Sequence, residues 1–173
     1  MLKVLKSMPV QDYSLTMDSY VPFKFRSFET QASVPFYWRV GDFKKSLIEV
    51  GLNPESGAVG SITVTCYGGN TRVEATWQSE HPGVEVVDGL PVCDIQDWSP
   101  KEQYADRFID ETNPFQAVIG LDFVSFRLLS DKQVTRVYVV GQLCIGVDEN
   151  GHACELAFRN LSKAEIEQVS PRS

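Results

Sequence analysis

The chain has 173 residues, the size of one domain, and its 43% hydrophobic and 23% charged residues are ordinary values for a globular protein. This composition excludes a disordered chain, a collagen-like repeat and a small disulfide-rich scaffold, and every apolar run is shorter than the ~20 residues of a membrane-spanning helix. Sixteen Lys and Arg residues against 23 Asp and Glu residues leave a net charge of −7. That balance disfavours binding to nucleic acid through its phosphates.

Alternation of apolar and polar residues dominates the chain, whereas helical periodicity is scarce. Apart from the first hairpin, described next, the alternation predicts strands over residues 21–28, 36–40, 73–77, 84–87, 117–129, 134–147 and 153–159. Many short strands joined by turns, with no long helices between them, are typical of packed antiparallel sheets. We therefore predict a mainly β fold, an antiparallel β-sandwich or partly open barrel with one or two short helices.

The clearest unit is a hairpin whose first strand ends at Leu52 and whose second strand begins at Ala58. Gly57 suits the left-handed residue of a type I turn with a bulge. Pairing Leu52 with Ala58 places Ile48 opposite Ile62. Since side chains alternate along a strand, the apolar residues of both strands then share one face, which we expect to be buried.

A second hairpin is predicted close to the C-terminal end. Pairing Val147 with His152 places Ile145 opposite Cys154, and it places Cys144 on the other face of the ribbon. We expect the thiols of all four cysteines to be reduced: Cys66, Cys93, Cys144 and Cys154. Because the N-terminal residues also lack the apolar stretch of a secretory signal, we expect a cytoplasmic protein.

Two short helices are predicted. Residues 162–169 begin with a capping Ser, and Glu165 completes a capping box three residues later. Residues 99–108 also begin with a capping Ser, and Pro100 occupies the first helical position. Both segments are too short to build a helical layer, so they are expected at the margins of the sheets.

The negative charge is concentrated in one part of the sequence. Residues 80–111 hold nine acidic and two basic residues, whereas the rest of the chain has 14 of each. The whole net charge therefore resides in about a fifth of the chain. We predict a single domain over residues 1–173 with an acidic loop or helix insertion at about 80–115.

Aromatic residues are interleaved with the acids of this segment, and this combination suits docking to a basic protein. Buried aromatic side chains anchor such interfaces, and carboxylates pair with Lys and Arg and accelerate the encounter. The predicted partner-binding residues are Asp94, Asp97, Trp98, Glu102, Tyr104, Asp106, Asp110 and Glu111. The alternative interpretation is a solvated acidic connection whose aromatic side chains pack on the sheet.

No motif indicates catalysis, a metal site or a cofactor. The two histidines, His81 and His152, each lie beside a turn, without the spacing of metal ligands, and we expect His81 on an exposed loop. No Gly-x-Ser-x-Gly motif is present. We predict that the chain is not an enzyme and binds neither metal nor cofactor, although paired carboxylates for acid–base chemistry stay open, because sequence spacing cannot place them across a sheet.

The first hairpin, SLIEVGLNPESGAVGSITVT over residues 46–65, resembles bacterial immunity proteins of contact-dependent growth inhibition and related polymorphic toxin systems. Proteins of that kind are small, often acidic and cytosolic, and each binds a cognate toxin domain and blocks its active site. The resemblance implies a non-catalytic antitoxin whose partner is the C-terminal domain of a toxin, expected to be a basic nuclease. It implies no direct contact with nucleic acid or membrane, and it assigns no site residue.

Two other functions are compatible with the sequence. The first is a β-barrel or sandwich enzyme or carrier that holds a small apolar ligand among the aromatic side chains of residues 20–38. A cavity lined by those side chains favours this function, and a filled core disfavours it. The second is a scaffold protein that associates with itself through the edge of a sheet.

Overall fold

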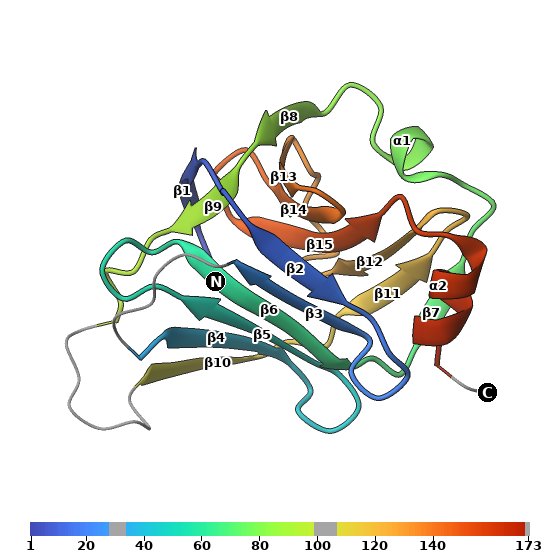
Figure 1. Cartoon of the computed structure of the whole chain (residues 1–173), viewed down its shortest axis with the longest axis horizontal. Helices are drawn as coiled ribbons and strands as arrows, with labels where there is room; N and C mark the ends of the chain where they lie inside the picture. The colour runs from blue at the N-terminus through green and yellow to red at the C-terminus, as the bar shows by residue number, and fades with distance from the viewer. Residues whose placement is uncertain (28–33, 99–106, 172–173) are drawn as a thin grey trace.

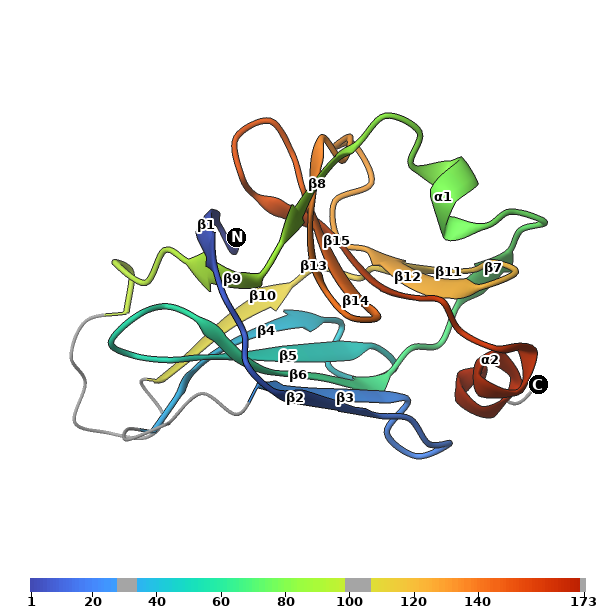
Figure 2. The same ribbon diagram turned by 45° about the horizontal axis from the view of Figure 1, so that its top comes forward.

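The computed structural model describes residues 1–27, 34–98 and 107–171, and two large sheets packed face to face make up most of it (Figure 1, Figure 2). In spatial order, the six-stranded sheet contains β10 (Phe108–Thr112), β4 (Phe36–Gly41), β5 (Leu47–Leu52), β6 (Val59–Cys66), β3 (Phe23–Ser27) and β2 (Tyr13–Thr16). The seven-stranded sheet contains β7 (Asn70–Arg72), β11 (Gln116–Ile119), β12 (Phe123–Arg127), β15 (Ala153–Arg159), β14 (Leu143–Val147), β13 (Arg136–Val140) and β8 (Glu85–Asp88). A third, two-stranded sheet pairs β1 (Val4–Met8) with β9 (Leu90–Cys93).

The mainly β fold is confirmed, and the described residues contain two short helices, α1 (Trp77–Glu80) and α2 (Lys163–Val169). The sheets are mixed, however, because β10, β7 and β8 run parallel to their neighbours β4, β11 and β13. Each of these three strands lies at the edge of its sheet. Within the described residues, no helix is long and apolar enough to cross a membrane.

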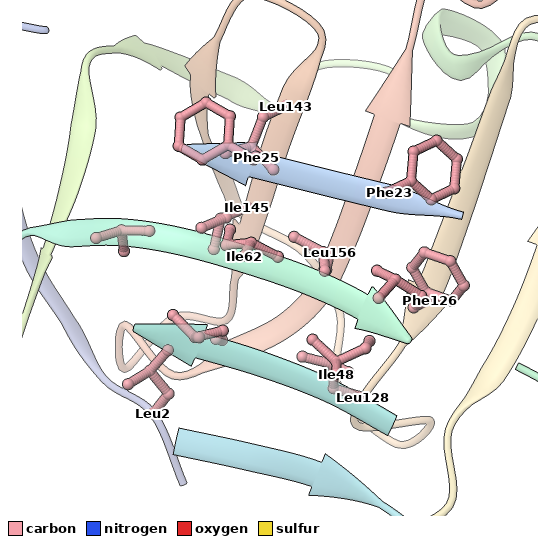
Figure 3. Close-up of a cluster of buried hydrophobic side chains, with 14 of the residues drawn as sticks. Leu2, Phe23, Phe25, Ile48, Ile62, Phe126, Leu128, Leu143, Ile145 and Leu156 are labelled. Carbon is pink, nitrogen blue, oxygen red and sulfur yellow. The ribbon is translucent and has the colours of Figure 1, made fainter. Parts of the chain in front are cut away.

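The main core lies between the two large sheets, whose strands cross each other (Figure 3). Phe23 and Ile62 of the six-stranded sheet face Phe126 and Leu156 of the seven-stranded sheet. All four side chains are buried. Burial of this apolar surface is the main favourable contribution to the folding free energy.

The seven-stranded sheet is also apolar on its outer face. Here Trp77 of α1 packs edge-on against Phe123, with ring centroids 5.8 Å apart. The small cluster around this pair contains Trp77, Val118, Phe123, Val137, Val139, Cys144 and Ala157. Because both faces of this sheet are covered, almost every residue of β14 and β15 is buried, and buried residues do not alternate with exposed ones.

Both predicted hairpins are present, but their registers differ from the predicted ones. In the first hairpin, Leu52 pairs with Val59 instead of Ala58, and a bulge between residues 51 and 52 adds a second residue of shift. Ile48 therefore lies opposite Val64 instead of Ile62, and because the total shift is two residues, the shared face is buried as expected. Gly57 has the predicted left-handed backbone, with φ of +78°. In the second hairpin, Val147 pairs with Ala153 instead of His152, and a bulge between residues 146 and 147 adds a second residue of shift, so Ile145 lies opposite Leu156 and not opposite Cys154. An extra residue in one strand shifts every pair beyond it.

Three predicted strands were wrong in extent or type. Residues 117–129 form two strands, β11 and β12, and residues 134–147 form β13 and β14, because each range contains a turn. Residues 73–77 form no strand, and Trp77 begins α1 instead. The predicted C-terminal helix is confirmed: Ser162 is the N-cap of α2, and Glu165 completes the capping box.

The predicted acidic insertion contains β8, β9 and β10, so its described residues contribute strands to all three sheets. Of the helix predicted over residues 99–108, residues 99–106 lie outside the described residues, and Phe108 begins β10. All four cysteines are free thiols.

Candidate partner-binding site

Five of the eight predicted partner-binding residues are described, and Glu102, Tyr104 and Asp106 lie outside the described residues. Asp94, Asp97 and Trp98 follow β9, while Asp110 and Glu111 are successive residues of β10. Four of these five side chains line one small pocket of about 170 Å³, which we call the acidic pocket. Its predicted members are Asp94, Asp97, Trp98 and Glu111.

Backbone contacts fix the loop that carries Asp94 and Asp97. The Asp94 N–H donates to the carbonyl oxygen of Lys3 at 2.8 Å, which ties the loop to the segment before β1. The Asp94 Oδ1 accepts from the N–H of Gln96 at 3.0 Å, and this bond closes a tight turn. Trp98 N–H then donates to the carbonyl of Ile95 at 3.0 Å. The carboxylates are therefore held on an ordered turn beside β1.

Trp98 is a wall of the acidic pocket rather than an exposed anchor. Only 8% of its surface is exposed, and its ring stacks on Phe36 with centroids 5.8 Å apart and planes 16° apart. Trp38, which is 3% exposed, also lines the pocket. Two buried indole rings thus lie beside the carboxylates, because the apolar side of each ring continues the main core.

Several acids of the segment are neutralised by cations from elsewhere in the chain. Asp110 accepts two hydrogen bonds from Arg39, at 2.7 and 2.8 Å, and Glu111 pairs with the amino group of Met1. Glu85 pairs with Arg136. Exposed pairs of this kind contribute little to stability, but they reduce the charge available to a partner.

Asp94 and Asp97 differ from these paired acids. Neither carboxylate forms an ion pair with any residue in the part of the chain that the structure describes. Asp97 is exposed and Asp94 is half-buried. The predicted docking surface is therefore reduced, among its described residues, to these two carboxylates at the mouth of the pocket.

Sequence reasoning missed a polar pair on the outer face of the seven-stranded sheet. His81, expected on an exposed loop, has only 12% of its side chain exposed and stacks on Trp77 with ring centroids 3.6 Å apart. Its Nε2 hydrogen-bonds Oε2 of Glu155 at 3.3 Å, and its Nδ1 lies 3.1 Å from the carbonyl oxygen of Trp77. The Glu155 side chain is 7% exposed. The two residues are 74 positions apart, so no local pattern could have paired them.

The aromatic side chains proposed to hold an apolar ligand contribute instead to the core. Phe23 and Phe25 are completely buried, and Phe36 is buried beneath Trp98. Phe25 also stacks on Tyr13 of the neighbouring strand, with ring centroids 5.8 Å apart. These contacts favour packing as the role of the three phenylalanines.

Other signs of function are few. Among residues 1–27, 34–98 and 107–171, no group of three or more His, Cys, Asp or Glu side chains could hold a metal ion. No model of a known protein family matches the chain, and no curated protein matches it either. The geometry of the acidic pocket and the resemblance of the first hairpin to immunity proteins are therefore the two indications of function.

Proposed function

We propose that this chain is a non-catalytic binding protein that docks a basic protein through the acidic pocket. The observation that supports the proposal is the pair Asp94 and Asp97, two carboxylates that form no ion pair with the described residues and lie on a turn beside two buried tryptophans. Following the resemblance of the first hairpin, the partner is the C-terminal domain of a polymorphic toxin. The protein then acts in the cytoplasm as its immunity protein.

The pocket suits the end of a Lys or Arg side chain. Its volume of about 170 Å³ accommodates a single long side chain but not a folded segment. Asp94 and Asp97 supply carboxylates for the cationic head, because Glu111 is already paired with the amino group of Met1, and these two acids outnumber the one lysine in the lining, Lys3. The indole surfaces of Trp38 and Trp98 pack against the methylene stem. A toxin that binds nucleic acid presents such cations in its substrate groove. Occupying them blocks the groove without any chemical step.

The net charge of −7 adds a long-range contribution. It attracts a basic partner before contact, so it raises the association rate more than it lowers the dissociation rate. Salt screens this attraction over about 10 Å at 0.1 M. Association should therefore slow as the salt concentration rises.

The test uses the C-terminal domain of the protein encoded directly upstream of this chain. Association and dissociation rates are measured by surface plasmon resonance at low and high salt. For the double variant Asp94→Lys/Asp97→Lys, the expected result is at least about tenfold slower association and a weaker salt dependence. The control, Glu74→Lys/Glu167→Lys, changes the net charge by the same amount at two exposed positions outside the acidic pocket. It should retain most of the association rate.

The two parts of the proposal fail separately. An equal decrease in the association rate of both double variants would show that only the net charge matters, and it would reject the acidic pocket as the docking site. If the unaltered chain neither binds the upstream domain nor reduces its toxicity in cells, the immunity role is rejected.

A further inference from the structure

Two neighbouring pockets of about 560 and 360 Å³ share three lining residues, Arg127, Leu129 and Ser130. We call the combined feature the Arg127 groove. One end lies beside Asn70 of β7, and the other lies beside Glu155 of β15. It shares no lining residue with the acidic pocket. Each pocket falls within the range of ~300–1,000 Å³ that is usual for ligand sites.

At one end of the groove, one oxygen of a buried carboxyl group lacks a hydrogen-bond partner among the described residues. Oε2 of Glu155 accepts from Nε2 of His81, but Oε1 has no hydrogen-bond partner among the described residues, although it lies 3.2 Å from the same nitrogen. Burying a polar oxygen without a hydrogen-bond partner costs free energy, and native proteins rarely contain such atoms. Glu155 lines the groove, but this oxygen is itself covered, so a ligand there supplies the missing donor once the carboxyl group turns toward it.

At the other end, two side-chain amides are fixed by bonds within the protein. The Nδ2 of Asn113 donates to the carbonyl oxygen of Leu128 at 2.7 Å, and the Nε2 of Gln116 donates to Oγ1 of Thr71 at 3.1 Å. Both bonds use only the nitrogen, so the orientation of each amide is set and its oxygen serves as an acceptor. Fixed acceptors of this kind bind hydroxyl groups at little cost in side-chain entropy.

The charges along the groove balance, unlike those of the whole chain. With His81 protonated, three cationic groups face three anionic groups: His81, Arg127 and Lys132 against Glu80, Asp131 and Glu155. Arg127 and Glu80 pair with each other at 3.4 Å. A balanced groove attracts neither a polyanion nor a polycation, and its polar lining does not suit an apolar ligand.

We infer that the Arg127 groove binds a neutral ligand rich in hydroxyl groups, that is, an uncharged oligosaccharide. Sugar hydroxyls both donate and accept hydrogen bonds. They can therefore donate to the Glu155 carboxylate and the fixed amide oxygens, and they can accept from Arg127 and Lys132. The half-buried ring of Phe115 adds an apolar surface for the C–H face of a sugar ring.

The test screens the full chain against an array of neutral oligosaccharides, sulfated and sialylated glycans, and uncharged polar peptides. Binding to at least one neutral oligosaccharide is expected, and the affinity of the best one is then measured by calorimetry. Asn70→Ala and Glu155→Gln should each weaken that binding at least about fivefold, while Glu74→Ala, outside the groove, should leave it unchanged.

Asn70 is exposed, so its substitution tests the groove even if Glu155→Gln reduces stability. A thermal melt of each variant establishes that it is folded. Binding of only anionic glycans or only peptides, or of no probe, would overturn the inference. So would neutral-sugar binding that both groove variants retain. None of these outcomes depends on the toxin domain, so they leave the proposed immunity function untouched.

Discussion

Phe23 of β3 stacks on Phe158 of β15, with ring centroids 4.0 Å apart and ring planes only 3° apart. The contact joins the two large sheets, because β3 belongs to the six-stranded sheet and β15 to the seven-stranded one. Both side chains are fully buried, and Phe126 meets Phe23 edge-on at 6.2 Å. This aromatic cluster is a central contact of the interface between the sheets.

Replacing Phe23 with Ala should lower the free energy of unfolding by about 3–5 kcal/mol, because it removes a buried ring and leaves a cavity between the sheets. Urea denaturation followed by tryptophan fluorescence measures the change. Tyr20→Ala is the control: Tyr20 is 88% exposed, so its loss should change stability by less than about 0.5 kcal/mol. A loss below about 1 kcal/mol for Phe23→Ala would contradict this role.

Gly57 lies at a close approach between two segments of chain. Its φ is +78°, and a Cβ built there would lie 2.2 Å from the carbonyl oxygen of Cys93. Gly57→Ala should therefore lower the free energy of unfolding by about 2 kcal/mol or more, because of backbone strain and the clash. At Gly69 a Cβ would meet nothing within 4 Å, so Gly69→Ala should be nearly neutral. Equal melting temperatures for the two variants would refute the close approach.

Some features of the fold could be predicted from the sequence because they depend only on neighbouring residues. The turn at Gly57 and the cap at Ser162 depend on a few adjacent residues, and both are confirmed. The bulges that shift the hairpin registers depend on packing between sheets, which no short pattern records. The fully exposed strand β7 has no apolar alternation to reveal it. The strand predicted over residues 117–129 was not divided at Gly120, because β11 and β12 on either side of it are both largely buried and no change of pattern marks the turn.

In the candidate site, too, features set by neighbouring residues could be predicted, and features set by strand order could not. The sequence located Asp94 and Asp97, because a concentration of acids is visible in one dimension. It could not show that Arg39, on a strand 71 positions away, neutralises Asp110. Pairing partners are set by strand order, which in these mixed sheets brings β10 beside β4.

The four thiols should differ sharply in reactivity. Burial raises the pKa of Cys93, Cys144 and Cys154 to about 12 each, so their reactive thiolate forms are scarce at pH 8. Cys66 is only half-buried, although burial and the charge of Asp42 also raise its pKa. In the folded protein, a colorimetric thiol reagent should modify at most Cys66, and only slowly.

The measurement compares folded and unfolded protein. Unfolding in guanidinium chloride should release all four thiols, and Cys66→Ser should remove the reaction of the folded state. Rapid modification of two or more thiols before unfolding would show that the structure around the buried cysteines opens more readily than its packing indicates.

The ion pair between His81 and Glu155 should make stability depend on pH. Burial by itself lowers the pKa of His81, but the hydrogen bond and charge of Glu155, the carbonyl of Trp77 and the charge of Glu80 outweigh it and raise the pKa above the usual 6.5. A histidine with a raised pKa stabilises the folded state fully below its unfolded pKa, and this contribution disappears as the pH rises through the folded pKa. The contribution of His81 should therefore be complete below about pH 6.5 and lost above the folded value.

Urea unfolding of the native chain and of His81→Asn, measured between pH 5.5 and 9, tests this dependence. The difference in unfolding free energy between them should be largest at the acidic end and should shrink as the pH rises. Leu5→Ala, which alters an exposed side chain without a titratable group, is the control and should keep the pH dependence of the native chain. An NMR titration that places the His81 midpoint at or below 6.5 would contradict the pairing, because an unpaired imidazole buried against Trp77 is easier to deprotonate than a free one.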